Sequence, residues 1–316
     1  MTLQAQIQQI LLVQIDQDDL AFRFSPLAPA LVEDSALAES IRRVGILHPP
    51  ILKKKLDDSY LVISGHTRVL LAARILRLPA LPCLVLPATC DEPLALEVAF
   101  EALGAKRVPT PMETAIFCRR LAEYLSAEEI AARFLPRLGL APTPYLVKQA
   151  IRLAELEEPF AVAIHQGRLH EAVGRELLDL PLPDRLALFE LIDLLQLSVG
   201  NQKKLVAICR ELSGRDNISL RSILGSAEIR EIFDHGAMNI PQKSAALMRY
   251  LTARRFPQLT GAEAEFQDFR HRLNLPANFS LEATPSFEDD RLRLTITLPG
   301  RQALAERLPA LLTAGR

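Results

Sequence analysis

The segment from residue 60 to residue 76, YLVISGHTRVLLAARIL, constrains the fold of this chain more than any other part of the sequence. Its first four residues are apolar and partly β-branched, a pattern that is typical of a buried strand. Ser64 and Gly65 end that pattern, and from Arg68 to Leu76 the apolar residues recur at helical spacing. The sequence therefore predicts a strand, a tight turn and a helix, with residues 64–68 at the turn.

The side chains of this turn suit a phosphate group. A helix N-terminus presents unpaired N–H groups and partial positive charge. Gly65 lets the backbone approach a ligand closely, Thr67 can cap the helix or donate to an oxygen, and Arg68 can fork onto two phosphate oxygens. The alternative is an ordinary strand-to-helix turn with a solvated arginine, because short turns that contain glycine are common. We predict a phosphate site formed by Ser64, Gly65, His66, Thr67 and Arg68.

The composition excludes several classes of protein. The formal net charge is −1, so any contact with DNA must come from a local basic patch. No apolar run approaches ~18 residues, so we expect no membrane span. Trp is absent and aromatic residues make up 5%, which argues against a base-stacking platform for single strands. We expect reduced thiols, no metal site and a cytoplasmic location, because no CxxC pair or histidine at ligand spacing accompanies Cys83, Cys90, Cys118 and Cys209.

Three regions with different patterns follow one another along the 316 residues. Residues 1–93 combine short strands and helices, and we expect a polar helical piece at the start and a first strand near residues 11–15. Residues 94–258 are typical of helices interrupted by Pro and Gly. The remainder, residues 259–316, predicts an α-β-β-α unit, with elements at 263–273, 279–284, 292–298 and 301–312. This unit is too small to be stable alone, so we expect it to dock or to dimerise.

Two sequence boxes in the first region resemble those of the ParB family of chromosome and plasmid partition proteins. Residues 37–51, LAESIRRVGILHPPI, resemble the family's LAxSIxxxGxxQPIxV box. Residues 63–68, ISGHTR, with Ala72 and Ala73 resemble the AGERRxRAA box, which binds nucleotide phosphate in that family. Residues 111–115 also resemble the NPxEEA start of the family's helical domain. Residues 126–135 and 143–154 fall where that family has its helix-turn-helix.

The resemblance implies an α+β fold with three domains. These are a ParB/sulfiredoxin-like nucleotide-binding domain at 1–93, a helical domain with a helix-turn-helix-like element at 94–258, and an αββα dimerisation domain at 259–316. The implied ligands are a nucleotide, CTP or ATP, with or without Mg²⁺, and DNA, and the implied assembly is a homodimer that can associate with the nucleoid. The expected nucleotide site adds His48 and Arg23 to the phosphate turn. The expected DNA contacts are Lys148, Arg152, Arg168 and Arg175.

The sequence also departs from the family at several positions. In the phosphate box, His66 replaces Glu, and Thr67 and Leu70 replace the first and third Arg. In the first box, His48 replaces Gln. Members that hydrolyse CTP carry an E-N-x-x-R motif, and without gaps its positions hold Ala102, Leu103 and Lys106. A nucleoside triphosphatase activity would therefore need a different set of residues. The predicted loop at 136–142 is also longer than a 3–4-residue helix-turn-helix turn.

Two other functions compete with a DNA-associated nucleotide switch. A small-molecule kinase of the free-serine-kinase type would use His66 as a base or phosphate ligand and Arg68 to stabilise the transferring group, with His48 and Glu39 assisting. A nucleotide-free protein would serve as an interaction scaffold. Sulfiredoxin chemistry needs a thiolate in the turn, and this turn has no Cys. The kinase has no use for the long helical region and the dimerising tail, so we favour the DNA-associated switch.

Overall fold

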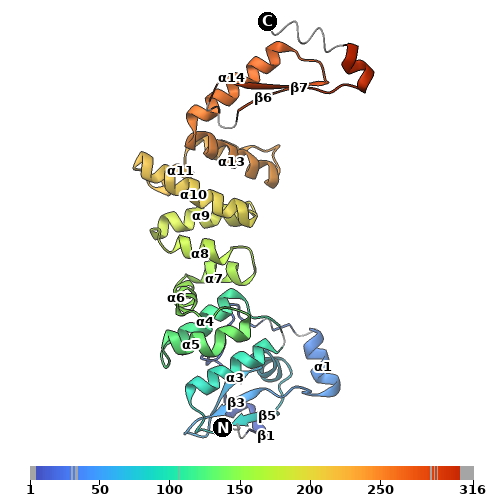
Figure 1. Cartoon of the computed structure of the whole chain (residues 1–316). Coiled ribbons are helices and arrows are strands. Elements are labelled where there is room, and N and C mark those ends of the chain that lie inside the picture. The colour runs from blue at the N-terminus through green and yellow to red at the C-terminus, as the bar shows by residue number, and fades with distance from the viewer. Residues whose placement is uncertain are drawn as a thin grey trace. The chain divides into compact units, whose positions relative to one another are not determined.

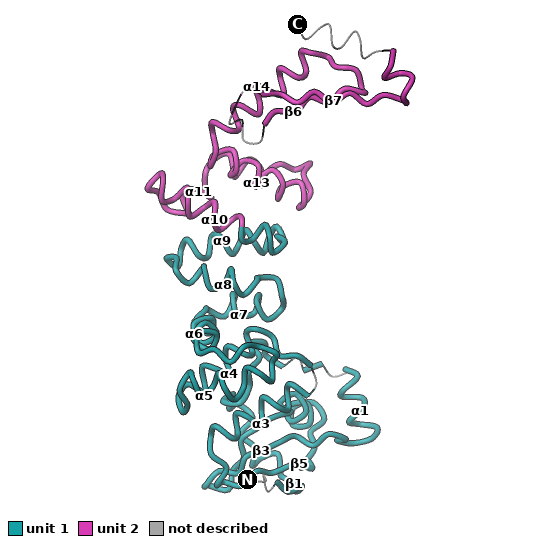
Figure 2. Tube along the Cα trace, in the orientation of Figure 1, with its two compact units in different colours: residues 1–203 teal, residues 204–316 magenta. Residues whose placement is uncertain are grey.

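The computed structural model describes residues 5–29, 31–32, 35–105, 107–284, 287, 289 and 291–306. The chain divides into two compact units, residues 1–203 and 204–316 (Figure 2). The architecture is mixed α+β and mostly helical, with one five-stranded sheet in the first unit (Figure 1). This confirms the predicted α+β class, whereas the domain boundaries at residues 93 and 258 stay predictions. None of the described helices is long and apolar enough to cross a membrane.

The sheet of the first unit has the strand order β1-β5-β3-β4-β2. β1 (Gln6–Leu11) pairs antiparallel with β5 (Ala80–Leu86), which pairs parallel with β3 (Ile51–Lys54). β3 in turn pairs antiparallel with β4 (Tyr60–Ser64), with an irregularity in register between Ile51 and Leu52. The two-residue strand β2 (Ile15–Asp16) runs parallel to β4 at the far edge. β4, which ends at the turn of residues 64–68, is thus an interior strand: β2 pairs with its first two residues, and Ile51 of β3 pairs with Ser64 at the turn.

The structure of the N-terminal residues differs from the one predicted from sequence. Residues 6–11 form strand β1 instead of a polar helix, and a short 3-10 turn (Leu12–Gln14) separates β1 from β2. The predicted first strand near residues 11–15 is therefore also misplaced. Glutamine is a good helix former, but the segment can pair along its length with β5, and strand preference depends strongly on such pairing.

Both faces of the sheet are covered. One face packs against the helix that follows the phosphate turn, through Val69 and Ala72. On the other face, Ile63 and Leu86 belong to a larger core that continues into the helices α3 (Glu92–Gly104), α4 (Pro111–Leu121) and α5 (Ala127–Phe134). The sheet and the first helices of the helical region therefore share one hydrophobic core.

Four phenylalanines lie at the centre of this shared core. The rings of Phe100 and Phe117 are stacked, with centroids 3.9 Å apart and planes 4° apart. Phe24 and Phe134 both meet the Phe117 ring edge-on, at 5.5 Å and 5.1 Å. Edge-to-face and stacked aromatic pairs favour particular geometries, so this cluster fixes α3 and α4 against the irregular segment that contains Phe24.

The remaining helices of the first unit follow at short intervals. They include the predicted pair around residues 126–154, namely α5 and α6 (Pro144–Leu153), with a 3-10 turn, η3 (Leu135–Leu138), in the loop between them. The capping box expected at Ser126 is present, with Glu129 as its partner. The series continues with α7 (Glu158–His165), α8 (Glu171–Leu177) and α9 (Leu182–Leu194), and α10 (Val199–Asp216) leads into the second unit.

Beyond α10, the described part of the second unit contains four helices, one hairpin and a short helical segment near its end. The helices are α11 (Leu220–Leu224), α12 (Ala227–Asp234), α13 (Ile240–Arg255) and α14 (Pro257–Leu273). The antiparallel strands β6 (Phe279–Ala283) and β7 (Leu292–Ile296) follow, as predicted. Residues 301–306 are helical, and the rest of the helix predicted to residue 312 lies outside the described residues.

Candidate functional site

The phosphate turn joins β4 directly to helix α2 (His66–Leu70), which continues as a π-helical turn over Leu71–Ile75. Gly65 precedes the helix in a left-handed conformation, with φ of 95°. A Cβ at this position would lie 3.2 Å from both the Pro50 Cα and the Arg68 Nη2 atom, so glycine is needed for two reasons. Thr67 lies inside the helix, which begins one residue before it, and the suggestion that Thr67 caps the helix is wrong.

Arg68 connects the turn to the first sequence box. Its Nη1 group donates to the carbonyl oxygen of His48. The His48 side chain is exposed and does not line the cavity described below, so only its backbone takes part in this contact. The arginine therefore holds the loop before β3 against the turn, and it also lines this cavity.

A cavity of about 440 Å³ opens over this turn. Its volume is within the range of small-molecule sites. The sequence-predicted residues that line it are Arg23, Ser64, Gly65, His66, Thr67 and Arg68, so the fold brings together all of them except the His48 side chain. Apolar groups from the segment around Phe22 and from α3 also line it. One cavity thus combines cationic and apolar surfaces, as a nucleotide requires.

Arg120 of α4 holds the segment that carries Arg23. Its guanidinium donates to the carbonyl oxygens of Leu20, at 3.0 Å, and Ala21, and lies 5.5 Å from the centre of the Phe24 ring. Burial lowers the pKa of Arg120 to about 10, which still leaves it charged at neutral pH. The segment is therefore fastened to α4 by its backbone, and Arg23 is left to line the cavity.

His66 is neutral in this environment. Burial lowers its pKa to about 4, and the charges of Arg23 and Arg120 act in the same direction, against the opposing effect of Asp19. Its Nε2 atom is buried without a hydrogen-bond partner among the described residues. The positive charge of the cavity therefore comes from its arginines.

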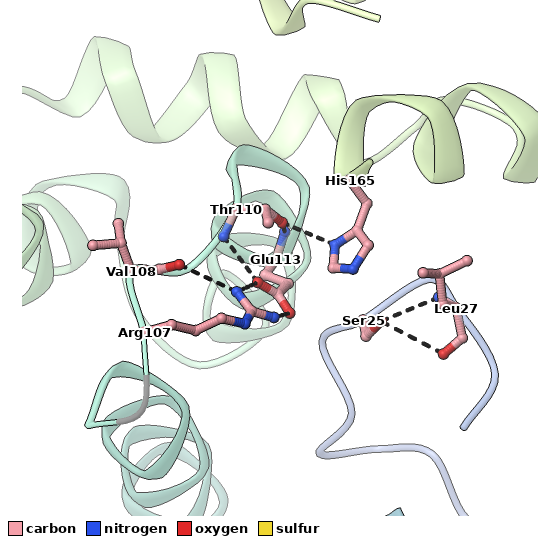
Figure 3. Close-up of polar contacts among 7 residues, drawn as sticks. All are labelled: Ser25, Leu27, Arg107, Val108, Thr110, Glu113 and His165. Atoms are coloured by element: carbon pink, nitrogen blue, oxygen red, sulfur yellow. Dashed lines mark hydrogen bonds and ion pairs between the residues drawn. The ribbon is translucent and has the colours of Figure 1, made fainter. Parts of the chain in front are cut away.

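A third arginine on the cavity wall was not predicted from the sequence. Arg107 lies in the linker between α3 and α4, and its Nη2 and Nη1 groups donate to the two carboxylate oxygens of Glu113 at 2.5 Å and 2.7 Å (Figure 3). Both side chains line the cavity. The sequence gives one signal for this part of the wall, which is the spacing from Thr110 to Glu113. This spacing matches a capping box, and the structure contains that capping box.

The cavity offers little to a metal ion. The described residues contain no group of three or more His, Cys, Asp or Glu side chains that could hold a metal. Of the described residues that line the cavity, Glu113 is the one with a carboxylate, and it already accepts hydrogen bonds from both Nη groups of Arg107. These residues do not form a Mg²⁺ site of their own. Of the positions aligned with the hydrolysis motif, Leu103 lines the cavity and Lys106 lies outside the described residues.

The residues predicted to contact DNA differ in their partners. Lys148 is exposed on α6 and has no ion pair among the described residues. Arg152 pairs with Asp179, Arg168 pairs with Asp193, and Arg175 lies 3.6 Å from Glu171. Each of these acids offsets a positive charge, so the local basic field is weak.

The groups that a kinase would need are not gathered at the cavity. Glu39 on α1 (Ala36–Val44) is exposed and does not line it, and the same holds for the His48 side chain. His66 remains the one group of the kinase hypothesis, besides Arg68, that lies on the wall.

No family model matches this sequence. A probable chromosome 1-partitioning protein ParB from Deinococcus radiodurans is 29% identical over 180 residues, which cover 57% of this chain and 58% of that protein. A probable chromosome-partitioning protein ParB from Neisseria meningitidis is 29% identical over 162 residues, covering 50% and 54%. A third, from Treponema pallidum, is 28% identical over 148 residues, covering 46% and 42%. The chain thus spans about half the length of the curated relatives it matches.

Two solved structures of ParB from Caulobacter crescentus are also similar, both of C-terminally truncated protein. The complex with CTP-γ-S has 21% identity and a TM-score of 0.25, and covers 59% of this chain and 98% of its own. The complex with the centromeric parS site has 19% identity and a TM-score of 0.35, and covers 63% and 98%. These scores are too low for the likeness to support an inference about this chain.

Proposed function

We propose that this chain is a DNA-associated partition protein of the ParB family, to which its curated relatives belong by name, and that its N-terminal cavity binds a nucleoside triphosphate, CTP or ATP, as a switch. We place the protein in the cytoplasm, associated with the nucleoid, as a homodimer through residues 259–316.

The observation that carries the nucleotide part of the proposal is the composition of the cavity. Among the described residues, three arginines, Arg23, Arg68 and Arg107, line it beside the N-terminus of the helix that follows Gly65, and Glu113 is the one carboxylate. Arginine forks match phosphate oxygens, and the apolar wall around Phe22 can hold a base or sugar. A cavity with this excess of positive charge favours a ligand with several negative charges.

The DNA part rests on the helices α5 and α6 and on the names of the curated relatives. α6 presents Lys148 to solvent and follows α5 after residues 135–143, a connection that contains one short 3-10 turn and is longer than the 3–4-residue turn of a helix-turn-helix. Since the nearby arginines are paired with acids, we expect weak and largely sequence-independent association unless the nucleotide or a second copy strengthens it.

The decisive experiment is calorimetric titration of the full chain with CTP, ATP and GTP, with and without double-stranded DNA. We expect one nucleotide to bind, and DNA to change its affinity by the same factor by which the nucleotide changes the affinity for DNA. A protein that binds none of the three would contradict the nucleotide switch, and equal affinities with and without DNA would contradict the coupling.

The variant Arg68→Ala locates the site. It removes a charged, forked contact worth roughly 1.5–3 kcal/mol, so nucleotide affinity should fall by about 10-fold to 100-fold while the circular dichroism spectrum is unchanged. Arg74→Ala is the matched control, because Arg74 follows on the same helical segment but pairs with Asp18 at 2.8 Å outside the cavity. Unchanged affinity in Arg68→Ala would remove the site assignment.

A further inference from the structure

The Arg107 guanidinium donates hydrogen bonds along one edge, and its other edge has no hydrogen-bond partner among the described residues. Its Nη1 and Nη2 groups hold the two oxygens of Glu113, and Nη1 also donates to the Val108 carbonyl at 3.1 Å. A guanidinium has five N–H donors in a rigid plane, so the Nε–H and the second N–H of Nη2 form another fork. No hydrogen bond within the described part of the chain uses Nε of Arg107.

The exposure of the two partners is very unequal. The side chain of Arg107 is 45% exposed, and that of Glu113 is 1% exposed. Both line the same cavity as the phosphate turn. The carboxylate is therefore the buried support, and the arginine is the group that a ligand can reach.

Three hydrogen-bond contacts hold the Glu113 carboxylate and its partner Thr110 in place. The backbone N–H of Thr110 donates to the Glu113 carboxylate at 2.8 Å, and the Glu113 N–H donates to Thr110 Oγ1 at 3.3 Å. Thr110 Oγ1 also lies 3.0 Å from Nδ1 of His165 on α7, as Figure 3 shows. Burial acts to raise the pKa of Glu113, but the hydrogen bonds from Arg107 and Thr110 together lower it, so the group stays a carboxylate at neutral pH.

We propose that Arg107 binds a phosphate group of the cavity's ligand through its open Nε–Nη2 edge, and that Glu113 is the positioning residue that fixes its orientation. The inference rests on the proposed function, because it names a further contact of the same nucleotide site. A guanidinium already held along one edge loses little freedom when a phosphate binds along the other. Among the described residues that line the cavity, Glu113 neutralises one of three arginine charges, and the remaining excess suits a polyphosphate better than a single carboxylate.

Calorimetry of the full chain with inorganic tripolyphosphate tests the contact directly. We expect Arg107→Ala to lower the affinity at least 10-fold, and Arg107→Lys not to restore it, since an ammonium group cannot hold a carboxylate and a phosphate with two forks. Glu113→Gln keeps the Arg107 side chain but weakens its support, and should lower the affinity at least 3-fold. Arg137→Ala is the control, because Arg137 is equally exposed but pairs with Glu97 and Glu101 outside the cavity.

Chemical rescue separates a ligand contact from a purely structural role. Added methylguanidinium should restore tripolyphosphate binding to Arg107→Ala, and should fail to do so in Arg107→Ala/Glu113→Gln, which lacks the carboxylate that would hold it. If circular dichroism shows that Glu113→Gln does not fold, Arg107→Ala and its rescue decide the question alone.

The two proposals can fail separately. Wild-type affinity in Arg107→Ala, together with a loss in Arg68→Ala, would overturn the role of Arg107 and leave the nucleotide site standing. Loss in Arg107→Ala without rescue would also overturn it, because the arginine would then act through the fold. A wild-type protein that binds neither tripolyphosphate nor any nucleotide would overturn both.

Discussion

His66 is the cavity residue whose pKa is most strongly changed by burial. The sequence places it where the family's phosphate box has Glu, and the structure buries its Nε2 atom without a partner among the described residues. The nearby cations Arg23 and Arg120 oppose its protonation. Its neutral ring leaves the arginine charges of the cavity available to a ligand.

The burial of His66 predicts a pH dependence of stability. Its pKa is 6.5 in the unfolded chain and about 4 in the folded one, so the unfolded state binds more protons between these values. The free energy of unfolding should therefore fall as the pH is lowered from about 6.5 to 4, by roughly 3 kcal/mol at the lower end. Urea denaturation at a series of pH values measures this fall, and His66→Gln should reduce it.

His48→Gln is the control for this measurement, since His48 is an exposed histidine in the same region. It should leave the pH dependence as it is in the wild-type protein. An equal fall in His66→Gln and wild type would show that other groups cause it.

At the scale of elements, the strand-turn-helix around Gly65 determines where the cavity forms. Gly65→Ala should destabilise the protein by about 1–2 kcal/mol, because an L-residue is disfavoured in the left-handed conformation and its Cβ would press on Pro50. Thermal or urea unfolding measures the loss. Gly104→Ala is the control: it adds a Cβ at the end of α3 with no atom within 4 Å, and should be neutral or slightly stabilising. Equal stability of the two variants would contradict the strain argument.

The turn could be predicted from sequence because the change from strand to helical periodicity is local, within residues 60–76. β1 could not, because its glutamines favour helix locally and its pairing with the distant β5 decides its structure. The Arg107–Glu113 pair was also missed. The sequence contains the capping-box spacing from Thr110 to Glu113, but spacing does not say which cation the buried carboxylate will hold.

The exposed basic residues of helix α6 are the ones that we expect to contact DNA. Lys148→Ala with Arg152→Ala should weaken DNA binding and reduce the slope of log K against log salt by up to about 2, since each phosphate contact contributes ~0.9. Lys148 should account for most of the effect, because Arg152 is held by Asp179. Filter binding or fluorescence anisotropy at several salt concentrations measures the slope.

The matched control for α6 is Arg133→Ala with Arg137→Ala, which removes two charges that both pair with Glu97 on α3. It should change the salt slope less. If the wild-type protein shows no salt-dependent binding in any nucleotide state at ~50 mM salt, the helix-turn-helix-like assignment fails and the helical region is better described as a protein-interaction bundle.

At the scale of the whole molecule, α14 and the hairpin of the second unit form a surface that the described residues of this unit leave largely exposed. None of the 17 residues of α14 is buried. In the hairpin, Leu281 lies opposite Leu294 and Ala283 opposite Leu292, so these side chains share one face. Leu281 is 7% exposed, whereas Leu292 and Leu294 are 47% and 50% exposed. A helix and a two-stranded hairpin with so little burial need a further partner to be stable.

We expect that partner to be the same region of a second copy. Truncation after Thr260 should therefore give a monomer in sedimentation velocity, while the full chain sediments as a dimer.

Leu292→Asp with Leu294→Asp tests the hairpin face more narrowly and should also give a monomer, because each change would bury an unpaired carboxylate in the interface. Arg293→Ser, on the opposite face of the same strand, is the control and should remain a dimer. A dimeric truncated chain would move the interface to the first 260 residues, and a dimeric double variant of the full chain would exclude the hairpin face while leaving α14 as the contact.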